Sequence, residues 1–411
     1  MNLTTPRCAI ALSALFICMP SLAGPGGGGY GSTPSWGTRY VPGDYPTIQS
    51  AIDAAASGDI IEVASGTYEE NLSVCDKSLT IRCLEGSAEA PMAYLHQAGG
   101  IGGNGPILFV VDSSNVTVQG FQFQSATDST TPAFDGRAIA VTGASLTVND
   151  CSFHIVKTSW IDVLTIVMGP VHFGAAINAD SSTVKVNDSS FNYCKAPQGG
   201  AIYSKNSDLV VRNSTFEECG DMYQAGAICS TGSGSVSLTQ CLFEYCESVY
   251  GSAAVSIYGQ LDAQIHRCVF DSNESDDSVV KMVTSTDWVK HTLTQNYFRD
   301  CGDIFDTPYK ALTMNSISTP LSTASKNLFS DSGYTPAKLL GLGGGDFVVW
   351  ETSSDCVSDV NFDGYHSVAD LLDILTYWSE CDPICDLNKS GVVDFDDLME
   401  LVTNFDSNCG H

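Results

Sequence analysis

The chain of 411 residues is 43% hydrophobic, which is enough to build a core and excludes wholesale disorder. Its 47 acidic residues outnumber the 18 basic ones, for a net charge of −29. Nucleic acids and anionic membranes attract Lys- and Arg-rich surfaces, so this charge argues against both as partners. It favours a cation-binding protein that works outside the cell, although acidity that serves solubility alone would give the same count.

The first 23 residues have the pattern of a secretory signal peptide. Arg7 precedes an apolar run over residues 8–19, and small residues then lead to a predicted cleavage after Ala23. This run is too short to span a bilayer, and no later segment is a candidate for a membrane span. Residues 24–38 are Gly-rich and are predicted to form a leader. Export to an oxidising compartment would permit disulfides among the remaining cysteines.

Ordered structure is predicted to begin near residue 39 with a short amphipathic helix. Pro46 would stand in its first turn and Gly58 would end it. The apolar residues that recur at helical spacing are Ile48, Ala51, Ile52 and Ala55. Residues 60–63 and 79–83 then have the composition of strands.

Three segments of this opening resemble the entry signature of the right-handed parallel β-helix superfamily, the fold of pectate lyases. They are residues 46–52 (Pro-Thr-Ile-Gln-x-Ala-Ile), 58–63 (Gly-Asp-x-Ile-x-Val) and 66–70 (Gly-Thr-Tyr-x-Glu). A solenoid exposes its core and its backbone at the first coil, so we expect the helix to cover that end.

A repeat then runs from about residue 105 to residue 301. Small residues precede an apolar triplet, a polar turn, an alternating strand and a Phe. The recurring Phe residues are Phe123, Phe153, Phe191, Phe216, Phe243, Phe270 and Phe298. Their spacings, mostly between 25 and 30 residues, indicate stacked coils. The repeats resemble those of polymorphic outer-membrane proteins, which use the same fold.

These patterns predict the fold class and the domains. Residues 39–350 are expected to form an all-β right-handed parallel β-helix with an N-terminal capping helix. Residues 351–355 would be a linker, and residues 356–411 a small all-α domain of EF-hand type. Asn327 to Phe329 would mark a final coil of the solenoid.

Cysteines are expected to stack in two columns inside the solenoid. Cys194, Cys219, Cys246 and Cys301 lie three residues after a repeat Phe, while Cys151, Cys241 and Cys268 lie two before one. Without paired Cys or His ligands nearby, buried thiols or occasional bridges are favoured over a metal cluster. Cys75 and Cys83 flank one turn and could pair.

One coil, between Phe153 and Phe191, is about ten residues too long. Its extra residues, within 154–173, include two His, a Lys, an Asp and a Trp that could line a groove. The run of apolar residues in the same segment would equally pack on the flank of the solenoid, and packing is the favoured interpretation.

The last 56 residues hold 12 acids and one Lys, in two units offset by 27 residues. Each unit has oxygen-bearing residues at loop positions 1, 3, 5, 9 and 12 and Gly at 6, the pattern of a calcium loop. The predicted ligands of two calcium ions are Asp359, Asn361, Asp363, the Tyr365 carbonyl, Ser367 and Asp370, and then Asp386, Asn388, Ser390, the Val392 carbonyl, Asp394 and Asp397. Repulsion among the carboxylates would couple folding to calcium.

Two such loops, each followed by a helix (residues 371–378 and 398–405), resemble a type I dockerin. The resemblance implies a cohesin-like or cell-surface protein partner. Positions 10 and 11, often a hydroxyl pair that contacts cohesin, are here Val368-Ala369 and Phe395-Asp396. Ser390 replaces the usual Asp or Asn at position 5, which should weaken the second site. Disulfides 356–381 and 385–409 are predicted to close the two units.

The function of the solenoid stays open between two classes. An exported protein that binds or displays toward polysaccharide is favoured. The alternative is a polysaccharide lyase or glycoside hydrolase acting on an acidic glycan such as pectin, which would need a base and a cation, or paired carboxylates, on one face. The basic residues of the repeats occupy different phases: Arg137, Lys157, Lys185, Lys205, Arg212, Arg267, Lys281, Lys290 and Arg299. Asp276 and Asp277 lie in a Ser/Asn-rich setting typical of a solvated turn.

Overall fold

The computed structural model describes most of the solenoid and of the C-terminal units. The described residues are 37–83, 93–96, 106–124, 138–154, 173–221, 224–284, 289–299, 301, 310–316, 323–330, 347–351, 358–361, 365–380, 382–403 and 405. The predicted signal peptide and leader, residues 155–172 of the long coil, and Asp363 lie outside them. Residues 36–411 form one compact unit.

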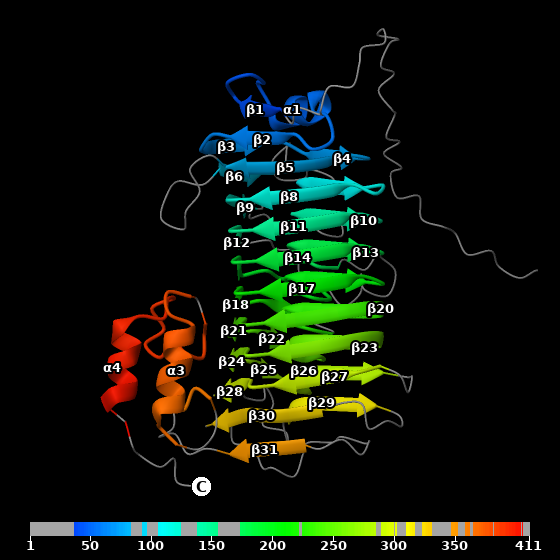
Figure 1. The fold of residues 1–411 in the computed structure, drawn as a ribbon. Coiled ribbons are helices and arrows are strands. Elements are labelled where there is room, and N and C mark those ends of the chain that lie inside the picture. The colour runs from blue at the N-terminus through cyan, green and yellow to red at the C-terminus, as the bar shows by residue number, and fades with distance from the viewer. Residues whose placement is uncertain are drawn as a thin grey trace, which may run out of the picture. The chain divides into compact units, whose positions relative to one another are not determined.

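Three columns of parallel strands make up the solenoid (Figure 1), and successive coils add one strand to each column in turn. The first column contains β4 (Leu72–Cys75), β7 (Leu108–Val111), β10 (Ile139–Thr142), β13 (Ile177–Asp180), β16 (Ile202–Lys205), the first parts of β20 (Ile228–Thr239) and β23 (Ser252–His266), β26 (Ser278–Thr284) and β29 (Lys310–Ser316).

The second column runs beside it and includes the first strand of the described chain. It contains β1 (Thr38–Val41), β2 (Ile60–Val63), β5 (Ser78–Cys83), β8 (Asn115–Gln119), β11 (Ser145–Asn149), β14 (Thr183–Asn187), β17 (Asp208–Arg212), the later parts of β20 and β23, β27 (His291–Thr294) and β30 (Thr323–Ser330).

The third column holds the shortest strands and ends the solenoid. It contains β3 (Gly66–Glu69), β6 (Ala93–His96), β9 (Phe121–Gln124), β12 (Ser152–His154), β15 (Ser190–Asn192), β18 (Thr215–Glu217), β21 (Leu242–Glu244), β24 (Val269–Asp271), β28 (Tyr297–Arg299), the end of β30, and β31 (Phe347–Glu351). A small separate sheet is formed by β19 (Gly220–Asp221), β22 (Glu247–Ser248) and β25 (Glu274–Ser275). The coil predicted at Asn327 is followed by one more strand, β31.

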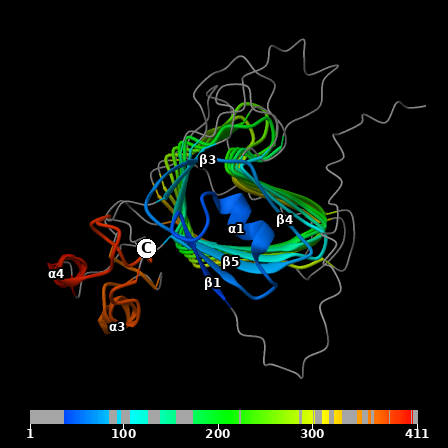
Figure 2. The same ribbon diagram turned by 90° about the horizontal axis from the view of Figure 1, so that it is seen from above.

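Helix α1 (Ile48–Ala54) lies over the first coil, as Figure 2 shows, and buries Ile48, Ala51 and Ile52 against it. The predicted apolar face is therefore confirmed. The predicted start is wrong, because Thr47 caps the helix together with Ser50 and Pro46 precedes the cap.

The entry signature has a structural explanation. The Glu70 carboxylate accepts hydrogen bonds from the backbone N–H groups of Ile48 (2.9 Å) and Gln49 (3.0 Å). These amides at a helix N-terminus have no partner inside the helix, and the helix dipole favours the negative charge. Asp59 accepts from the Gly37 amide at 2.8 Å and pairs with Arg39 at 2.7 Å. The conserved spacing of the motif thus fastens the helix to the first coils.

Seven phenylalanines form one stack through the interior of the solenoid. From Phe123 to Phe298, neighbouring ring centroids lie 4.6–4.9 Å apart with interplanar angles of at most 11°. All seven side chains are fully buried. The centroid distance equals the roughly 4.8 Å separation of hydrogen-bonded strands, so the Phe period predicted from the sequence is confirmed as the coil repeat.

The turn between the second and third columns uses a left-handed backbone in coil after coil. The residues with φ between 46° and 56° at this turn are Asp150, Asp188, Asn213, Gln240, Arg267 and Gln295. Asp and Asn tolerate this conformation best, and Arg is uncommon there. Arg267 therefore occupies a position whose backbone does not favour it.

The predicted cysteine columns are buried thiols. Cys151, Cys194, Cys219, Cys241, Cys246, Cys268 and Cys301 are all free and buried. The thiol of Cys219 donates to the Phe191 carbonyl at 3.4 Å, and that of Cys246 to the Phe216 carbonyl at 3.4 Å. Burial raises the pKa of Cys151 to about 12, which keeps this thiol neutral.

Two of the predicted disulfides are wrong. Cys83 is a free thiol while Cys75 is disulfide-bonded, so the two do not pair with each other. Cys385 is also free and buried, and its sulfur accepts a hydrogen bond from Arg267 Nη2 at 3.3 Å. The thiol is turned into a contact with the solenoid, away from any bridge to residue 409. The predicted 356–381 pair lies outside the described residues.

Two helices form the C-terminal module, α3 (Val368–Thr376) and α4 (Phe395–Thr403). Both begin three residues before their predicted starts, because position 9 of each loop acts at the helix cap. Ser367 caps α3 in a capping box with Asp370. The residues at loop positions 10 and 11 therefore belong to the first turn of each helix.

Candidate functional site

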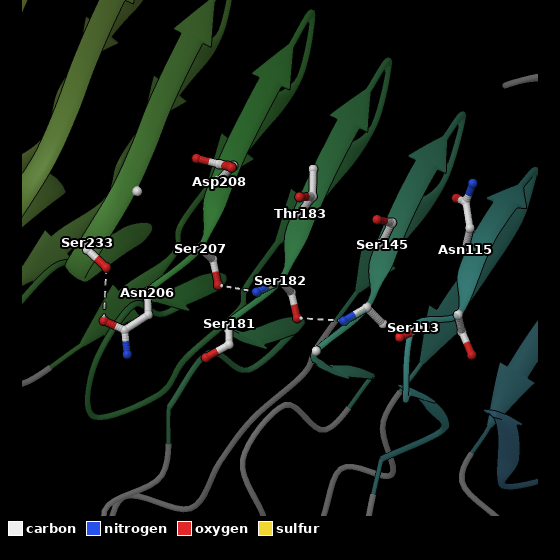
Figure 3. Close-up of a pocket in the computed structure, with 14 residues that line it drawn as sticks. Ser113, Asn115, Ser145, Ser181, Ser182, Thr183, Asn206, Ser207, Asp208 and Ser233 are labelled. Atoms are coloured by element: carbon white, nitrogen blue, oxygen red, sulfur yellow. Dashed lines mark hydrogen bonds between the residues drawn. The ribbon is translucent and has the colours of Figure 1, made fainter. Parts of the chain in front are cut away.

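A polar groove runs along the turns between the first and second columns. Figure 3 shows its side chains projecting from successive coils. The groove has a volume of about 390 Å³ and is lined by Ser113, Ser114, Asn115, Gly143, Ala144, Ser145, Ser181, Ser182, Thr183, Asn206, Ser207, Asp208, Ser233 and Gly234. The sequence presents these residues only as turn formers, which is why the groove could not be predicted.

The inner residues of the groove have structural hydrogen bonds. Ser182 Oγ donates to the Asp180 carbonyl at 2.7 Å, and Ser207 Oγ to the Lys205 carbonyl at 2.7 Å. Ser207 Oγ also accepts from the Ser182 amide at 3.0 Å, which links two coils. These buried serines hold neighbouring turns in register.

The outer residues of the groove are exposed and hydrogen-bond mostly to each other. Ser181, Asn206 and Ser233 face solvent in successive coils, and Ser233 Oγ lies 3.5 Å from Asn206 Oδ1. Asp208 is the one acid in the lining, and no Lys, Arg, His or aromatic residue contributes to it. This surface offers hydroxyl, amide and carbonyl groups once per coil, at a spacing of roughly 4.8 Å. It is suited to bind a hydroxyl-rich polymer and lacks the groups for acid–base chemistry.

The long coil is described only at its two ends. Phe173, at its end, stacks on Tyr203 of β16 with ring centroids 4.3 Å apart. Tyr203 and Cys229 form a small buried cluster with Ala225, against which Phe173 packs. This end of the long coil thus packs on the outside of the first column, as the favoured interpretation predicts, and the rest lies outside the described residues.

A charged cluster lies farther along the outer face of the first column. The Lys281 ammonium pairs with the Asp277 carboxylate and lies 5.9 Å from the centroid of the Tyr258 ring. Burial acts to lower the pKa of Lys281, but the hydrogen bond to Asp277 outweighs it and the pKa is raised. Burial also raises the pKa of Tyr258. Asp277 is therefore not the solvated turn residue that its sequence setting indicates.

Both predicted calcium loops close on a fully buried aspartate at position 12. Asp370 and Asp397 each accept hydrogen bonds from the backbone N–H groups of loop positions 3 and 9. The donors are Asn361 and Ser367 in the first loop, at 3.2 and 2.7 Å, and Asn388 and Asp394 in the second, at 3.1 and 2.8 Å. The two loops share this arrangement, so the duplication in sequence is also a duplication in geometry.

The other predicted ligands lie around these two aspartates. Asp359 is buried, whereas the Tyr365 ring is exposed, so only its predicted carbonyl faces the loop question. In the second loop Asp386 accepts from the amides of Ser390 (2.9 Å) and Gly391 (2.7 Å). Ser390 Oγ donates to the Val392 carbonyl at 3.0 Å.

The loops fit a divalent cation on two observations. The buried Oδ1 of Asn361, at position 3, has no hydrogen-bond partner among the described residues. Burial raises the pKa of Asp386, and repulsion from Asp397 and Asp394 adds to the shift against the hydrogen bonds from the loop amides. A cation would relieve both. Within the described residues, which omit Asp363, no group of three or more His, Cys, Asp or Glu side chains could hold a metal ion, so calcium stays a prediction.

The module also presents an apolar surface to solvent. The side chains of Val368, Leu372 and Leu375 on α3, and of Phe395, Met399 and Val402 on α4, are each between 45% and 59% exposed. The members of the two sets correspond to each other at the 27-residue offset. We call them the apolar stripes. The opposite side of each helix is buried, through Ile374 and Leu401.

The chain belongs to the right-handed β-helix family, because the model of the right handed beta helix region matches residues 100–306, about half of the chain. No curated protein matches the sequence. Within the described residues, no helix is long and apolar enough to cross a membrane.

Several solved structures are similar to the chain. A mutant of the PL6 family alginate lyase AlyGC is 16% identical with a TM-score of 0.47, and the match covers 73% of this chain and 41% of the lyase. The tailspike protein gp49 of Acinetobacter baumannii bacteriophage Fri1, a capsular polysaccharide depolymerase, is 10% identical with a TM-score of 0.36, over 72% and 52%. The Streptococcus pneumoniae surface adhesin PfbA is 15% identical with a TM-score of 0.40, over 77% and 90%. This chain thus spans less than half the length of the lyase, and such distant similarity assigns it neither activity nor ligand.

Proposed function

We propose that the chain is an exported β-helix protein that binds an extended polysaccharide along the polar groove. The observation behind this proposal is the row of exposed Ser, Thr and Asn side chains on successive coils, with one acid and no base in the lining. Sugar hydroxyls pair with such groups as both donors and acceptors. The single acid, Asp208, disfavours a polyanion, so an uncharged polymer lying along the coils fits best. Export rests on the signal-peptide pattern of residues 1–23.

Binding calorimetry with neutral and with uronate oligosaccharides tests the groove. The double variant S181A/N206A should weaken binding by about tenfold, because it removes two hydrogen bonds of about 0.5–1.5 kcal/mol each. The control N192A changes an amide of the third column, outside the groove. Absence of saturable binding to every probe, or equal weakening by N192A, would rule the groove out as the binding site.

We also infer that the C-terminal module binds two calcium ions. The support is the shared geometry of the two loops around Asp370 and Asp397 and the unpartnered Oδ1 of Asn361. Bound calcium would take side-chain and carbonyl oxygens of each loop and neutralise carboxylates that otherwise repel one another. Calorimetric titration of the full chain with calcium should give heat that Asp359→Ala reduces in the first site and Asp386→Ala in the second. No heat with the wild type contradicts the assignment.

The apolar stripes support a protein partner for the module, of cohesin-like or other cell-surface type. Two exposed apolar rows on adjacent helices resemble a helix face that docks against another protein. The hydroxyl pair often used toward cohesin is replaced by Val368-Ala369 and Phe395-Asp396, so the expected contact is apolar. Replacing Leu372 and Met399 by Ser should abolish capture of such a partner while leaving the calcium heat unchanged.

A second candidate, cleavage of an acidic polysaccharide, is favoured by the cluster of Lys281, Asp277 and Tyr258. A lysine ammonium could neutralise a uronate and a tyrosine could exchange a proton at the sugar ring. The raised pKa of Lys281 suits a cation that binds a carboxylate and does not suit a general base. Incubation with pectin and alginate should then release unsaturated products, visible by ultraviolet absorbance, and Lys281→Met should abolish them. A wild-type protein that releases neither unsaturated nor reducing ends leaves binding as the function.

A further inference from the structure

The outward-facing residues of the third column change in character along the solenoid. Ser152, Ser190 and Thr215 are register partners in successive coils. The same column then continues with Leu242, Val269 and Tyr297. Three polar residues are thus followed by three apolar ones at equivalent positions. A solvent-facing strand gives no reason for this change, so these three coils are built to be covered.

The cover is the C-terminal module of the same chain. Val269 belongs to one buried cluster with Ile384, Cys385 and Val393, and Leu242 and Tyr297 pack against it. The module therefore completes its small core with side chains of the solenoid.

The turn preceding these strands changes in the same coils. Where earlier coils have Asp188 and Asn213, the next two have Gln240 and Arg267, and both donate to Asp382. Gln240 Nε2 lies 3.0 Å from Asp382 Oδ2, and Arg267 binds both carboxylate oxygens, through Nε at 2.9 Å and Nη2 at 3.0 Å.

This ion pair is withdrawn from solvent and has additional partners. The Arg267 side chain is 3% exposed and that of Asp382 is fully buried. The guanidinium carbon lies 4.2 Å from the centroid of the Tyr377 ring. A bidentate pair in such a setting fixes geometry, and removal of one partner leaves a buried charge without compensation. This explains an Arg at a left-handed position that its backbone disfavours.

The ends of the same two strands attract the only basic residue of the last 56 residues. Lys389, in the second calcium loop, lies 2.9 Å from Asp271 and 3.7 Å from Glu244. Asp271 also pairs with Arg299 at 2.6 Å. Asp271 and Glu244 are register partners, so β21 and β24 each contribute a turn residue, an apolar residue and an acid to the contact.

We propose that the module is docked on the flank of its own solenoid as a fixed part of the molecule, through the docking face Gln240, Leu242, Glu244, Arg267, Val269 and Asp271. The apolar stripes stay exposed in this docked state. A protein bound to the stripes would therefore hold the solenoid, with its polar groove, in one orientation. The docking face rests on residues distinct from those of the calcium sites and of the polar groove.

Zero-length carbodiimide coupling of the full chain, followed by peptide mass spectrometry, tests this docking. It joins a Lys amine to a carboxylate only at contact distance, so Lys389 should couple to Asp271 or Glu244 within one chain. Arg267→Gln, which takes the residue of the neighbouring coil, should reduce the coupling at least about tenfold, in keeping with the loss of a buried charge pair. Arg212→Gln removes an exposed Arg from an uncovered coil and should leave the coupling unchanged.

Hydrogen exchange of the same three proteins provides the second measurement. In Arg267→Gln the amides of Ile384 and Cys385, which donate to Asp382, should exchange roughly a hundredfold faster, while those of β15 stay protected. Absence of the intramolecular coupling in the wild type, coupling only between chains in a mixed-isotope sample, or equal exchange in all three proteins would overturn the proposal. Calcium heat with no coupling would leave the metal sites standing and remove the docking.

Discussion

The solenoid and the C-terminal module both repeat a unit of about 27 residues, but they satisfy their polar groups in opposite ways. In the solenoid, each coil hands its hydrogen bonds to the next: Asn273 Nδ2 donates to the Phe243 carbonyl at 2.9 Å, and its Oδ1 accepts from the Cys246 amide at 2.8 Å. In the module, the repeats turn their oxygens inward around Asp370 and Asp397. Stacking therefore makes a coil self-sufficient given neighbours, whereas the module depends on something added, a cation inside and the solenoid beside it.

The largest effect is expected in the phenylalanine stack. Phe216→Ala removes a fully buried ring between Phe191 and Phe243 and should cost about 3–5 kcal/mol of unfolding free energy. Denaturant unfolding measures it. Phe298→Ala is the matched control, because among the described residues this ring stacks only on Phe270. If both variants lose the same stability, the continuous stack is not what stabilises the coils.

Calcium removal should affect the module nearly as much. At a thousandfold excess of calcium over the dissociation constant, binding to the folded state alone stabilises it by about 4 kcal/mol. Thermal unfolding with calcium and with a chelator should differ accordingly. Asp397→Asn should reduce the difference, whereas Asp396→Asn, at the neighbouring exposed position outside the predicted ligand set, should keep it. Unchanged unfolding in chelator would show that the module is as self-sufficient as a coil.

An intermediate effect is expected where a coil passes its hydrogen bonds to the next. Asn273→Ala leaves the Cys246 amide and the Phe243 carbonyl without their partner and should cost about 1–3 kcal/mol. Asn273→Cys should cost less, because cysteines at the equivalent position of neighbouring coils bond to the corresponding carbonyl, as Cys246 does to Phe216. Equal losses for Ala and Cys would mean that the column is set by volume alone.

The smallest effect is a pH dependence within the solenoid. Burial lowers the pKa of His291, and the Leu261 carbonyl and Asp262 oppose the shift only in part. The unfolded chain then binds more protons than the folded one between the lowered pKa and the ordinary value of about 6.5, so stability rises with pH across that window. Acidification from about pH 7 to pH 5 should therefore destabilise the protein, and His291→Gln should flatten the profile. An unchanged slope would place the dependence elsewhere, with His266, whose pKa burial also lowers, as the next candidate.

Sequence reasoning succeeded where a feature recurs at a fixed period. The Phe positions predicted the coil repeat, the cysteine offsets predicted buried columns, and the spacing of Ile48, Ala51 and Ile52 predicted the buried face of α1. It failed at pairings between residues far apart in the chain. Cys385 was predicted to close its own unit by a disulfide, but its thiol contacts Arg267, more than a hundred residues earlier.

The candidate sites divide along the same line. The calcium ligands follow from local spacing, because one short loop supplies them all. The polar groove does not, since Ser181 and Asn206 become neighbours only when coils stack, and each alone is an ordinary turn residue. The same holds for Lys281 and Tyr258, which adjacent strands bring together.

The sequence by itself determined the architecture of this protein, a parallel β-helix with a capping helix and a duplicated acidic module, because periodic burial and loop spacing are local properties of the chain. Only the tertiary structure decided which surfaces face solvent and which face each other. The change from Ser and Thr to Leu, Val and Tyr along the third column has no meaning in the sequence until the module is placed against it. Arg267 shows the physical reason: its backbone position disfavours it, and a buried carboxylate supplied from the far end of the chain makes it stable there.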